Sequence, residues 1–272
     1  MKDLTTDMIT ISSLCAVAFD LDDTLAPSKS KIDQRMAQLL DQLLEHLDVC
    51  IISGGRFEQF DTQVLRFLNA RPQLLARLHI MPTCGTRYYT WSHGKWSMIY
   101  AEDLSEREKL EIEQVLTEGA KLLGFWEPNP WGDIIEDRGS QVTYSALGQQ
   151  APVEIKYEWD RDGAKKMKLR DYAAARLPGL EVHVGGATSV DVTRKGIDKA
   201  YGIGRLLTQL EIEAEQLLFI GDRLSEGGND YPVRALGVRW VEVRRWPDTA
   251  EYVEMLLNDA RADRNSSPGV SR

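Results

Sequence analysis

Three short apolar runs, each ending at a polar or small residue, constrain the fold of this chain more than any other feature. The runs lie at residues 15–19, 49–52 and 217–220. They lead into Asp20, into Ser53 and, after one glycine, into Asp222. Runs of this length that are apolar on both faces are typical of buried strands in a parallel sheet. Ligands of such sheets bind beyond the carboxyl ends of the strands, so these polar residues mark a candidate site.

Amphipathic stretches between the runs predict the helices that cover this sheet. Residues 34–47 and 57–68 carry apolar side chains at helical spacing, and each stretch follows one of the first two runs. Strand, helix, strand, helix is the order of an α/β fold, and right-handed crossovers then make the sheet parallel. We therefore expect a Rossmann-like α/β core.

The middle of the chain predicts a second, smaller α+β unit inserted into the first. Residues 88–100 have the pattern of a hairpin, and Ser105 and Glu108 have the spacing of a capping box that opens a helix. Further segments indicate an antiparallel sheet with helices: alternating patterns at 134–138, 141–146 and 153–159, a helix at 165–177 and a strand at 180–184. The expected division is a core at 1–87 and 189–262, an insert at 88–188, and a disordered tail at 263–272.

The net charge of the chain limits the kinds of molecule that it is expected to bind. Lys and Arg total 33 against 42 Asp and Glu, a formal net charge of −9, which disfavours nucleic acid and anionic membranes as partners. No apolar run approaches the roughly 18 residues of a membrane span, and the first residues lack the apolar centre of a signal peptide. Cys15, Cys50 and Cys84 are odd in number and widely spaced, as expected of reduced thiols in a cytoplasmic protein.

The segment Asp20-Leu21-Asp22-Asp23-Thr24 indicates a cation site. Three carboxylates within four residues repel one another, and a bound cation relieves that repulsion. Mg²⁺ prefers a few oxygen ligands and several waters, often shared with a phosphate. We expect Asp20, the carbonyl of Asp22 and Asp222 to supply the ligands.

Ser53, Gly54 and Gly55 are candidate ligands for a phosphoryl group. They follow the second apolar run and precede a predicted helix. The hydroxyl and backbone N–H groups at such a point can donate to phosphoryl oxygens.

Four ordered motifs resemble those of the haloacid-dehalogenase-like phosphotransferases. They are DLDDT at Asp20, the serine of ISGG at Ser53, Lys199 within TRKGIDKAYG, and GDRLSEGGND from Gly221. The long insert resembles the class IIB cap of that superfamily. Within the insert and after it, IEDR, SALG, GGATSVD and GGND are similar to the eukaryotic-type phosphomannomutases.

The resemblance implies a role for each motif residue. Asp20 would be the nucleophile that forms an aspartyl-phosphate, and Asp22 the general acid and then the general base. Ser53 and Lys199 would bind phosphoryl oxygens. Lys195 is a rival for the motif lysine, but the spacing in the family favours Lys199. Asn229 and Asp230 are expected to hold metal-bound waters or Lys199 without binding Mg²⁺ themselves.

The resemblance also assigns the insert a second phosphate site, and here the chain departs from the family. Phosphomannomutases bind the distal phosphate with several arginines. Arg138, Ser189 and Asp191 fall on matching positions, but Gln149 replaces one arginine and Lys29 stands where an early arginine is usual. The cations that could compensate are Lys156, Arg161, Lys165 and Lys166, although a solvated surface explains them as well.

These observations predict a Mg²⁺-dependent phosphotransferase acting on a small phosphorylated metabolite. Fewer guanidinium groups weaken distal phosphate binding, which a mutase needs and a phosphatase does not, so a sugar-phosphate phosphatase is the first expectation. A phosphomannomutase-type phosphomutase is the alternative, and a non-catalytic sugar-phosphate sensor is a third. The mutases it resembles pair through their caps, which leaves a homodimer open.

Overall fold

The computed structural model describes residues 9–266. The chain divides into two compact units. The core unit holds the residues up to Tyr100 and from Asp198 onward, and the cap unit holds Ala101–Ile197.

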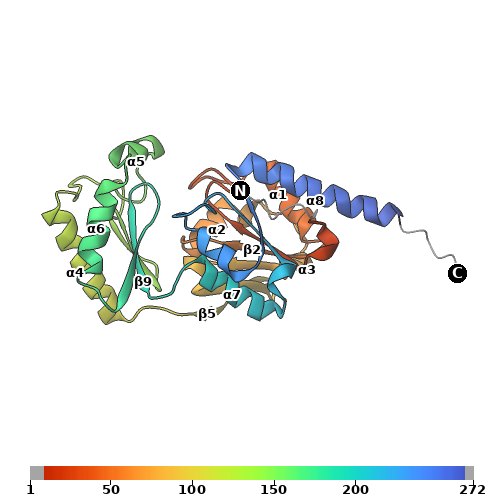
Figure 1. The fold of residues 1–272 in the computed structure, drawn as a ribbon, viewed down its shortest axis with the longest axis horizontal. Helices are drawn as coiled ribbons and strands as arrows, with labels where there is room; N and C mark the ends of the chain where they lie inside the picture. The colour runs from red at the N-terminus through yellow and green to blue at the C-terminus, as the bar shows by residue number, and fades with distance from the viewer. Residues whose placement is uncertain (1–8, 267–272) are drawn as a thin grey trace. The chain divides into compact units, whose positions relative to one another are not determined.

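A seven-stranded sheet forms the centre of the core unit (Figure 1). Its strands, in spatial order, are β11 (Arg239–Glu242), β10 (Leu217–Gly221), β1 (Ala16–Asp20), β2 (Asp48–Ile52), β3 (Leu78–Met81), β4 (Arg87–Ser92) and β5 (Lys95–Ala101). The first five run parallel, whereas β4 pairs antiparallel with β3. The α/β core predicted from the apolar runs is confirmed.

Both faces of this sheet are buried, as the alternate residues of its central strand β1 show. Val17 and Phe19 pack in one apolar cluster with α1 (Gln34–Leu43) and α8 (Trp246–Ser266). Ala16 and Ala18 pack in another with α7 (Lys199–Leu210). Because side chains of a strand point alternately to its two faces, helices cover the sheet on both sides. Two short helices, α2 (Phe57–Gln63) and α3 (Pro72–Leu75), complete the unit.

The cap unit is an antiparallel sheet with an apolar face and a polar face. Its strands, in spatial order, are β6 (Ile135–Asp137), β7 (Gln141–Ser145), β9 (Ser189–Arg194) and β8 (Leu180–Val184). Its helices are α4 (Glu106–Leu122), α5 (Val153–Trp159) and α6 (Ala164–Ala174). Val142 and Tyr144 pack against Ile112 of α4 and Leu169 of α6, so the alternate residues of β7, Thr143 and Ser145, lie on the opposite, polar face.

The boundaries of the insert differ from the predicted 88–188 at both ends. The hairpin β4–β5 extends the core sheet, and Tyr89 stacks on Phe57 of the core unit with ring centroids 4.3 Å apart. At the other end, β9 pairs with β7 and β8 of the cap, although residues 189–194 were expected in the core. The inserted unit is therefore Ala101–Ile197.

Two smaller predictions also need correction. Residues 153–159 alternate like a strand but form α5, which follows Pro152 and buries none of its side chains, so the alternation marked no buried face. The predicted disordered tail at 263–272 begins inside α8, which continues to Ser266. The remaining residues, 267–272, lie outside the described part of the chain.

Candidate active site

The carboxyl ends of three neighbouring parallel strands bring the predicted site residues together. Asp20 is the last residue of β1, and it pairs in register with Ile52 of β2. Ser53 follows β2 directly, and Asp222 follows β10, which pairs with β1 on its other side. The sheet therefore places an acid, a hydroxyl and a second acid at one edge, as the three apolar runs predicted.

A buried lysine bridges two of the acids. Lys199 is the first residue of α7, whose N-cap Asp198 accepts a hydrogen bond from the backbone N–H of Tyr201. The Lys199 ammonium lies 2.5 Å from Asp20 Oδ1 and also binds Asp230 Oδ1. Only 1% of the Lys199 side chain is exposed. Lys195, the rival in the sequence, is exposed.

Burial and like charge set the protonation of this group. Burial raises the pKa of Asp20 well above its ordinary value, Lys199 opposes that shift, and the charges of Asp230 and Asp222 add to it. Burial raises the pKa of Asp222 as well, with Asp230 contributing. For Lys199, burial alone would lower the pKa, but Asp20 and Asp230 outweigh it and the pKa is raised. One ammonium does not neutralise three neighbouring acids, so the site favours a further cation.

The acids have the chemistry of a site for a hard divalent cation. One carboxylate oxygen each of Asp20, Asp222 and Asp230 lies within 4.8 Å of the others. Asp230 is already engaged, because Oδ1 binds Lys199 and Oδ2 accepts from the backbone N–H of Arg223 at 3.1 Å. Asp20 and Asp222 are therefore the two acids better able to bind an ion, and oxygen ligands of this kind suit Mg²⁺.

Two glycines let Asp230 reach Lys199. A Cβ on Gly221 would collide with Asp230 Oδ2, and a Cβ on Gly228 would collide with the carbonyl oxygen of Arg223. The turn after β10 thus needs small residues to fold the chain back onto the strand end. Asn229, predicted beside Asp230 as an outer ligand, is exposed in that turn.

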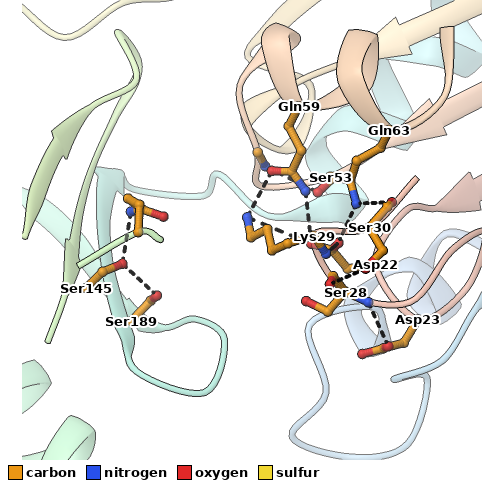
Figure 2. Close-up of polar contacts among 12 residues, drawn as sticks. Asp22, Asp23, Ser28, Lys29, Ser30, Ser53, Gln59, Gln63, Ser145 and Ser189 are labelled. Atoms are coloured by element: carbon orange, nitrogen blue, oxygen red, sulfur yellow. Dashed lines mark hydrogen bonds and ion pairs between the residues drawn. The ribbon is translucent and has the colours of Figure 1, made fainter. Parts of the chain in front are cut away.

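Asp22 lies in the loop after β1, and other parts of the core unit hold its carboxylate. Its Oδ1 accepts from the backbone N–H of Lys29 at 2.8 Å, and the Lys29 ammonium lies 4.0 Å from Oδ2. Lys29, expected among the substrate-binding residues, is thus placed beside the predicted acid–base residue. Gln59 and Gln63 also donate to Asp22 (Figure 2). Neither glutamine was predicted from the sequence; the available signal was their four-residue spacing on a helix that follows Gly55.

A left-handed turn at the end of β3 supports the loop that begins at Ser53. Thr83, Cys84 and Gly85 have φ of 48°, 55° and 85°. The backbone N–H of Cys84 donates to the carbonyl of Ser53, and that of Thr83 donates to the carbonyl of Gly55, each at 3.0 Å. Ser53 Oγ accepts from the N–H of Gly55 at 3.2 Å. This turn, also missed, fixes the Ser53–Gly54–Gly55 loop.

The polar face of the cap sheet carries two of the predicted cap residues. Ser189 lies opposite Ser145, with their Oγ atoms 3.2 Å apart (Figure 2), and Gln149 Nε2 donates to Ser145 Oγ at 2.9 Å. Asp191 lies opposite Thr143 and accepts from its hydroxyl at 2.7 Å. This face is therefore a network of hydroxyl, amide and carboxylate groups.

Arg138, the predicted cap arginine, is paired within the cap. Its Nε and Nη2 both donate to Glu136 Oε2 at 2.7 Å, and 8% of its side chain is exposed. The cations proposed to compensate are also engaged: Lys156 Nζ binds the carbonyl of Gln149, and Lys166 Nζ binds that of Gly186. Arg161 pairs with Glu158, and Lys165 lies over the ring of Trp159.

Comparison with known proteins gives the family. A sequence model described as eukaryotic phosphomannomutase matches residues 120–258 of the 272. This chain belongs to the eukaryotic phosphomannomutase family. It is 26% identical to phosphomannomutase 1 of Mus musculus over 227 residues, a match that covers 80% of this chain and 82% of the mouse protein.

Solved structures agree on the fold of this phosphomannomutase-family chain. A haloacid dehalogenase-like hydrolase from Bacteroides thetaiotaomicron matches with a TM-score of 0.59 at 17% identity, covering 89% of this chain and 99% of the other. The IMP-nucleotidase of Plasmodium falciparum matches with a TM-score of 0.69 at 17% identity, covering 93% of this chain and 64% of that one. The family match and the phosphomannomutase relatives, together with this fold, make the chain an enzyme of the haloacid-dehalogenase phosphatase and phosphomutase type. None of the helices in residues 9–266 has the length and hydropathy needed to cross a membrane.

Proposed function

We propose that this protein is a Mg²⁺-dependent phosphatase that hydrolyses a small sugar phosphate through an aspartyl-phosphate. The observation that carries the proposal is the placement of Asp20 at a strand end, with its carboxylate held by the buried ammonium of Lys199. A carboxylate in such a place is a suitable nucleophile, and the ammonium can offset the negative charge of an incoming phosphate.

In the first half of the reaction a carboxylate oxygen of Asp20 attacks phosphorus. The bond from phosphorus to the sugar oxygen breaks, and that oxygen takes a proton from Asp22. Ser53 Oγ and the backbone N–H of Gly54 donate to the phosphoryl oxygens, which accumulate charge as the bond breaks.

In the second half water attacks the aspartyl-phosphate. Asp22, now ionised, takes a proton from the water, the bond between phosphorus and the Asp20 oxygen breaks, and inorganic phosphate leaves. Each half returns Asp22 to the form that the other half needs, so one residue serves as acid and base.

Asp20, Asp222 and the backbone carbonyl of Asp22 would hold Mg²⁺. The three acids whose oxygens lie within 4.8 Å, and the raised pKa values of Asp20 and Asp222, support this assignment. When bound, the ion would favour the ionised Asp20 and neutralise charge on the transferring phosphoryl group.

The cap supports hydrolysis over transfer between two ends of a sugar. A mutase must hold a second phosphate, and guanidinium groups do so best because they bind phosphate in a bidentate way. Arg138 is paired with Glu136, and Gln149 donates to Ser145 where the family usually has an arginine. Ser189 and Asp191 suit the hydroxyl groups of a sugar better than a second phosphate.

Phosphomannomutase-type transfer is the second candidate, and the family itself favours it. The relatives over most of the chain are named phosphomannomutases. A homodimer through the caps, which the resemblance implied, stays a prediction.

One assay separates the two. The protein is supplied with mannose 1-phosphate, Mg²⁺ and a catalytic amount of glucose 1,6-bisphosphate, and both mannose 6-phosphate and free phosphate are measured. We expect free phosphate to dominate. Efficient formation of mannose 6-phosphate with little free phosphate would establish the mutase instead.

A sensor that binds a sugar phosphate without turning it over is tested on the same material. We expect Mg²⁺-dependent release of phosphate from at least one ester in a broad panel, and loss of that release in Asp20→Asn with the fold intact. Tight binding of one ester without turnover would support the sensor.

A further inference from the structure

Three N–H donors converge on the carboxylate of Asp22 (Figure 2). Oδ1 accepts from the backbone N–H of Lys29 at 2.8 Å and from Gln63 Nε2 at 3.4 Å. Oδ2 accepts from Gln59 Nε2 at 3.0 Å. Both carboxylate oxygens are thus held, although a quarter of the side chain, 26%, is exposed.

Each glutamine amide has a second partner that decides which of its ends faces Asp22. The Lys29 ammonium donates to Gln59 Oε1 at 3.0 Å. An ammonium can only donate, so the oxygen of this amide must face Lys29 and its NH₂ group must face Asp22. The carbonyl of Ser30, which can only accept, takes a hydrogen bond from Gln63 Nε2 at 2.7 Å, so the NH₂ group of Gln63 faces that side.

The fold places both amides on one face of one short helix. Gln59 and Gln63 lie four residues apart on α2, and this spacing puts their side chains next to each other. Gly55, which lies just before the helix, leaves room for Gln59, because a Cβ on Gly55 would collide with Gln59 Oε1. Gln63 is 3% exposed, and its backbone carbonyl accepts from the N–H of Ile32 at 2.8 Å. The helix that follows the Ser53 loop is therefore tied to the Asp22 loop.

We propose that Gln59 and Gln63 are positioning residues that orient the Asp22 carboxyl for proton transfer, with Lys29 and Ser30 setting the direction of the two amides. The inference rests on the proposed function, in which Asp22 gives and takes the proton. A general acid must keep its proton within hydrogen-bond reach of the leaving oxygen. Neutral amides can fix the carboxyl without placing a charge directly on it, and the Lys29 ammonium stays 4.0 Å from Asp22 Oδ2.

The two halves of the reaction depend on Asp22 to different degrees, and this gives a test. A sugar hydroxyl is a poor leaving group and needs the proton from Asp22. The p-nitrophenolate ion leaves without one. Water needs Asp22 as a base in the second half whichever ester was used. A misplaced Asp22 should therefore spare the first turnover of p-nitrophenyl phosphate and slow every later one.

The experiment compares Gln59→Leu and Gln63→Leu with wild type, using p-nitrophenyl phosphate and mannose 1-phosphate. The matched control is Glu58→Gln, on the same helix but with a side chain in solvent, 72% exposed. We expect steady-state kcat to fall about 100-fold for both esters in the glutamine variants, within the usual range for acid–base catalysis. Release of p-nitrophenol in a single turnover should stay within about threefold of wild type, giving a burst. KM for this ester should fall together with kcat, because kcat/KM reports the unchanged first half.

The outcomes separate this inference from the proposed function. Variants that match wild type in kcat, or that slow the single turnover as much as kcat, would overturn the positioning role. Wild type with no turnover, or Asp20→Asn with full turnover, would overturn the proposed function instead. Thermal unfolding reports whether each variant folds. If Gln63→Leu does not fold, the half-buried Gln59 decides the result alone.

Discussion

The ammonium of Lys199 lies 2.5 Å from the Asp20 carboxylate in a place where only 1% of the lysine side chain is exposed. Asp230, which is fully buried, binds the same ammonium. Removing one member of this group would leave the others buried without a counter-charge, which is costly for the fold.

Replacing Lys199 should therefore destabilise the protein. In Lys199→Met, Asp20 and Asp230 remain buried without their cation, and we expect the free energy of unfolding to fall by about 3–5 kcal/mol, measured by urea denaturation. Lys195→Met is the control, because Lys195 is exposed and its loss should have little effect. Equal losses of unfolding free energy in the two variants would contradict the structural role of Lys199.

Gly221→Ala should break the contact between Asp230 and Lys199. The added Cβ collides with Asp230 Oδ2, so we expect lower stability and strongly reduced turnover. In Gly204→Ala, on α7, the Cβ meets nothing within 4 Å, and the better helix propensity of alanine should raise stability by about 1 kcal/mol. Thermal unfolding of both variants measures this difference in stability. Equal melting temperatures for the two variants would contradict the prediction.

Removing Mg²⁺ should stop turnover and lower the melting temperature. The ion would offset the burial and the like charge that raise the pKa of Asp20 and Asp222, and a ligand that binds only the folded state stabilises it. We expect Asp222→Asn to weaken the apparent Mg²⁺ affinity about tenfold or more, measured as the Mg²⁺ dependence of turnover and of melting. Turnover that persists undiminished in a chelator would refute the metal assignment.

The capping box formed by Ser105 and Glu108 should make the stability of the cap unit depend on pH. Glu108 accepts from the hydroxyl and the backbone N–H of Ser105 and from Arg194, and these bonds lower its pKa to about 2. Because this pKa is depressed, the stability from the capping box is present above the ordinary value of 4.5 and is lost as the pH falls towards 2. An NMR titration of the Glu108 carboxyl should show its pKa move towards 4.5 in Ser105→Ala. The pKa of Glu108 should not change in Gln114→Ala, because Gln114 lies on the exposed side of the same helix.

Gln149→Arg should strengthen binding of a second phosphate. Gln149 donates to Ser145 on the polar face of the cap sheet, and a guanidinium there could bind phosphate in a bidentate way. We expect hexose 1,6-bisphosphate to inhibit this variant several-fold more strongly than wild type. Gln150→Arg, one residue on and exposed, serves as the control. If both variants respond equally, a general charge effect explains the result.

The residues at the carboxyl ends of the parallel strands could be predicted because the sequence patterns that mark them are local. Buried strands need continuous apolar runs, and parallel pairing brings their ends together, so Asp20, Ser53 and Asp222 followed from the pattern alone. Lys199 came from the family resemblance, because the spacing in the family favours it over Lys195.

What could not be predicted depends on which partner a residue meets in space. The hairpin β4–β5 has a clear pattern, but periodicity does not say which sheet it joins. Gln59 and Gln63 resemble the solvent face of a helix until the Asp22 loop is placed beside them. The family resemblance predicts Arg138 as a ligand for phosphate, but in the structure its guanidinium pairs with Glu136.

The cap is one continuous stretch, Ala101–Ile197, with an apolar cluster of its own. Every residue assigned to the breaking of the phosphorus–oxygen bond belongs to the other unit. Mutations on the polar face of the cap sheet can therefore accumulate without altering the chemistry, because the two sets of residues share no packing cluster. Over evolutionary time a chain built in this way can exchange one phosphate ester for another while it inherits the same nucleophile, acid and lysine.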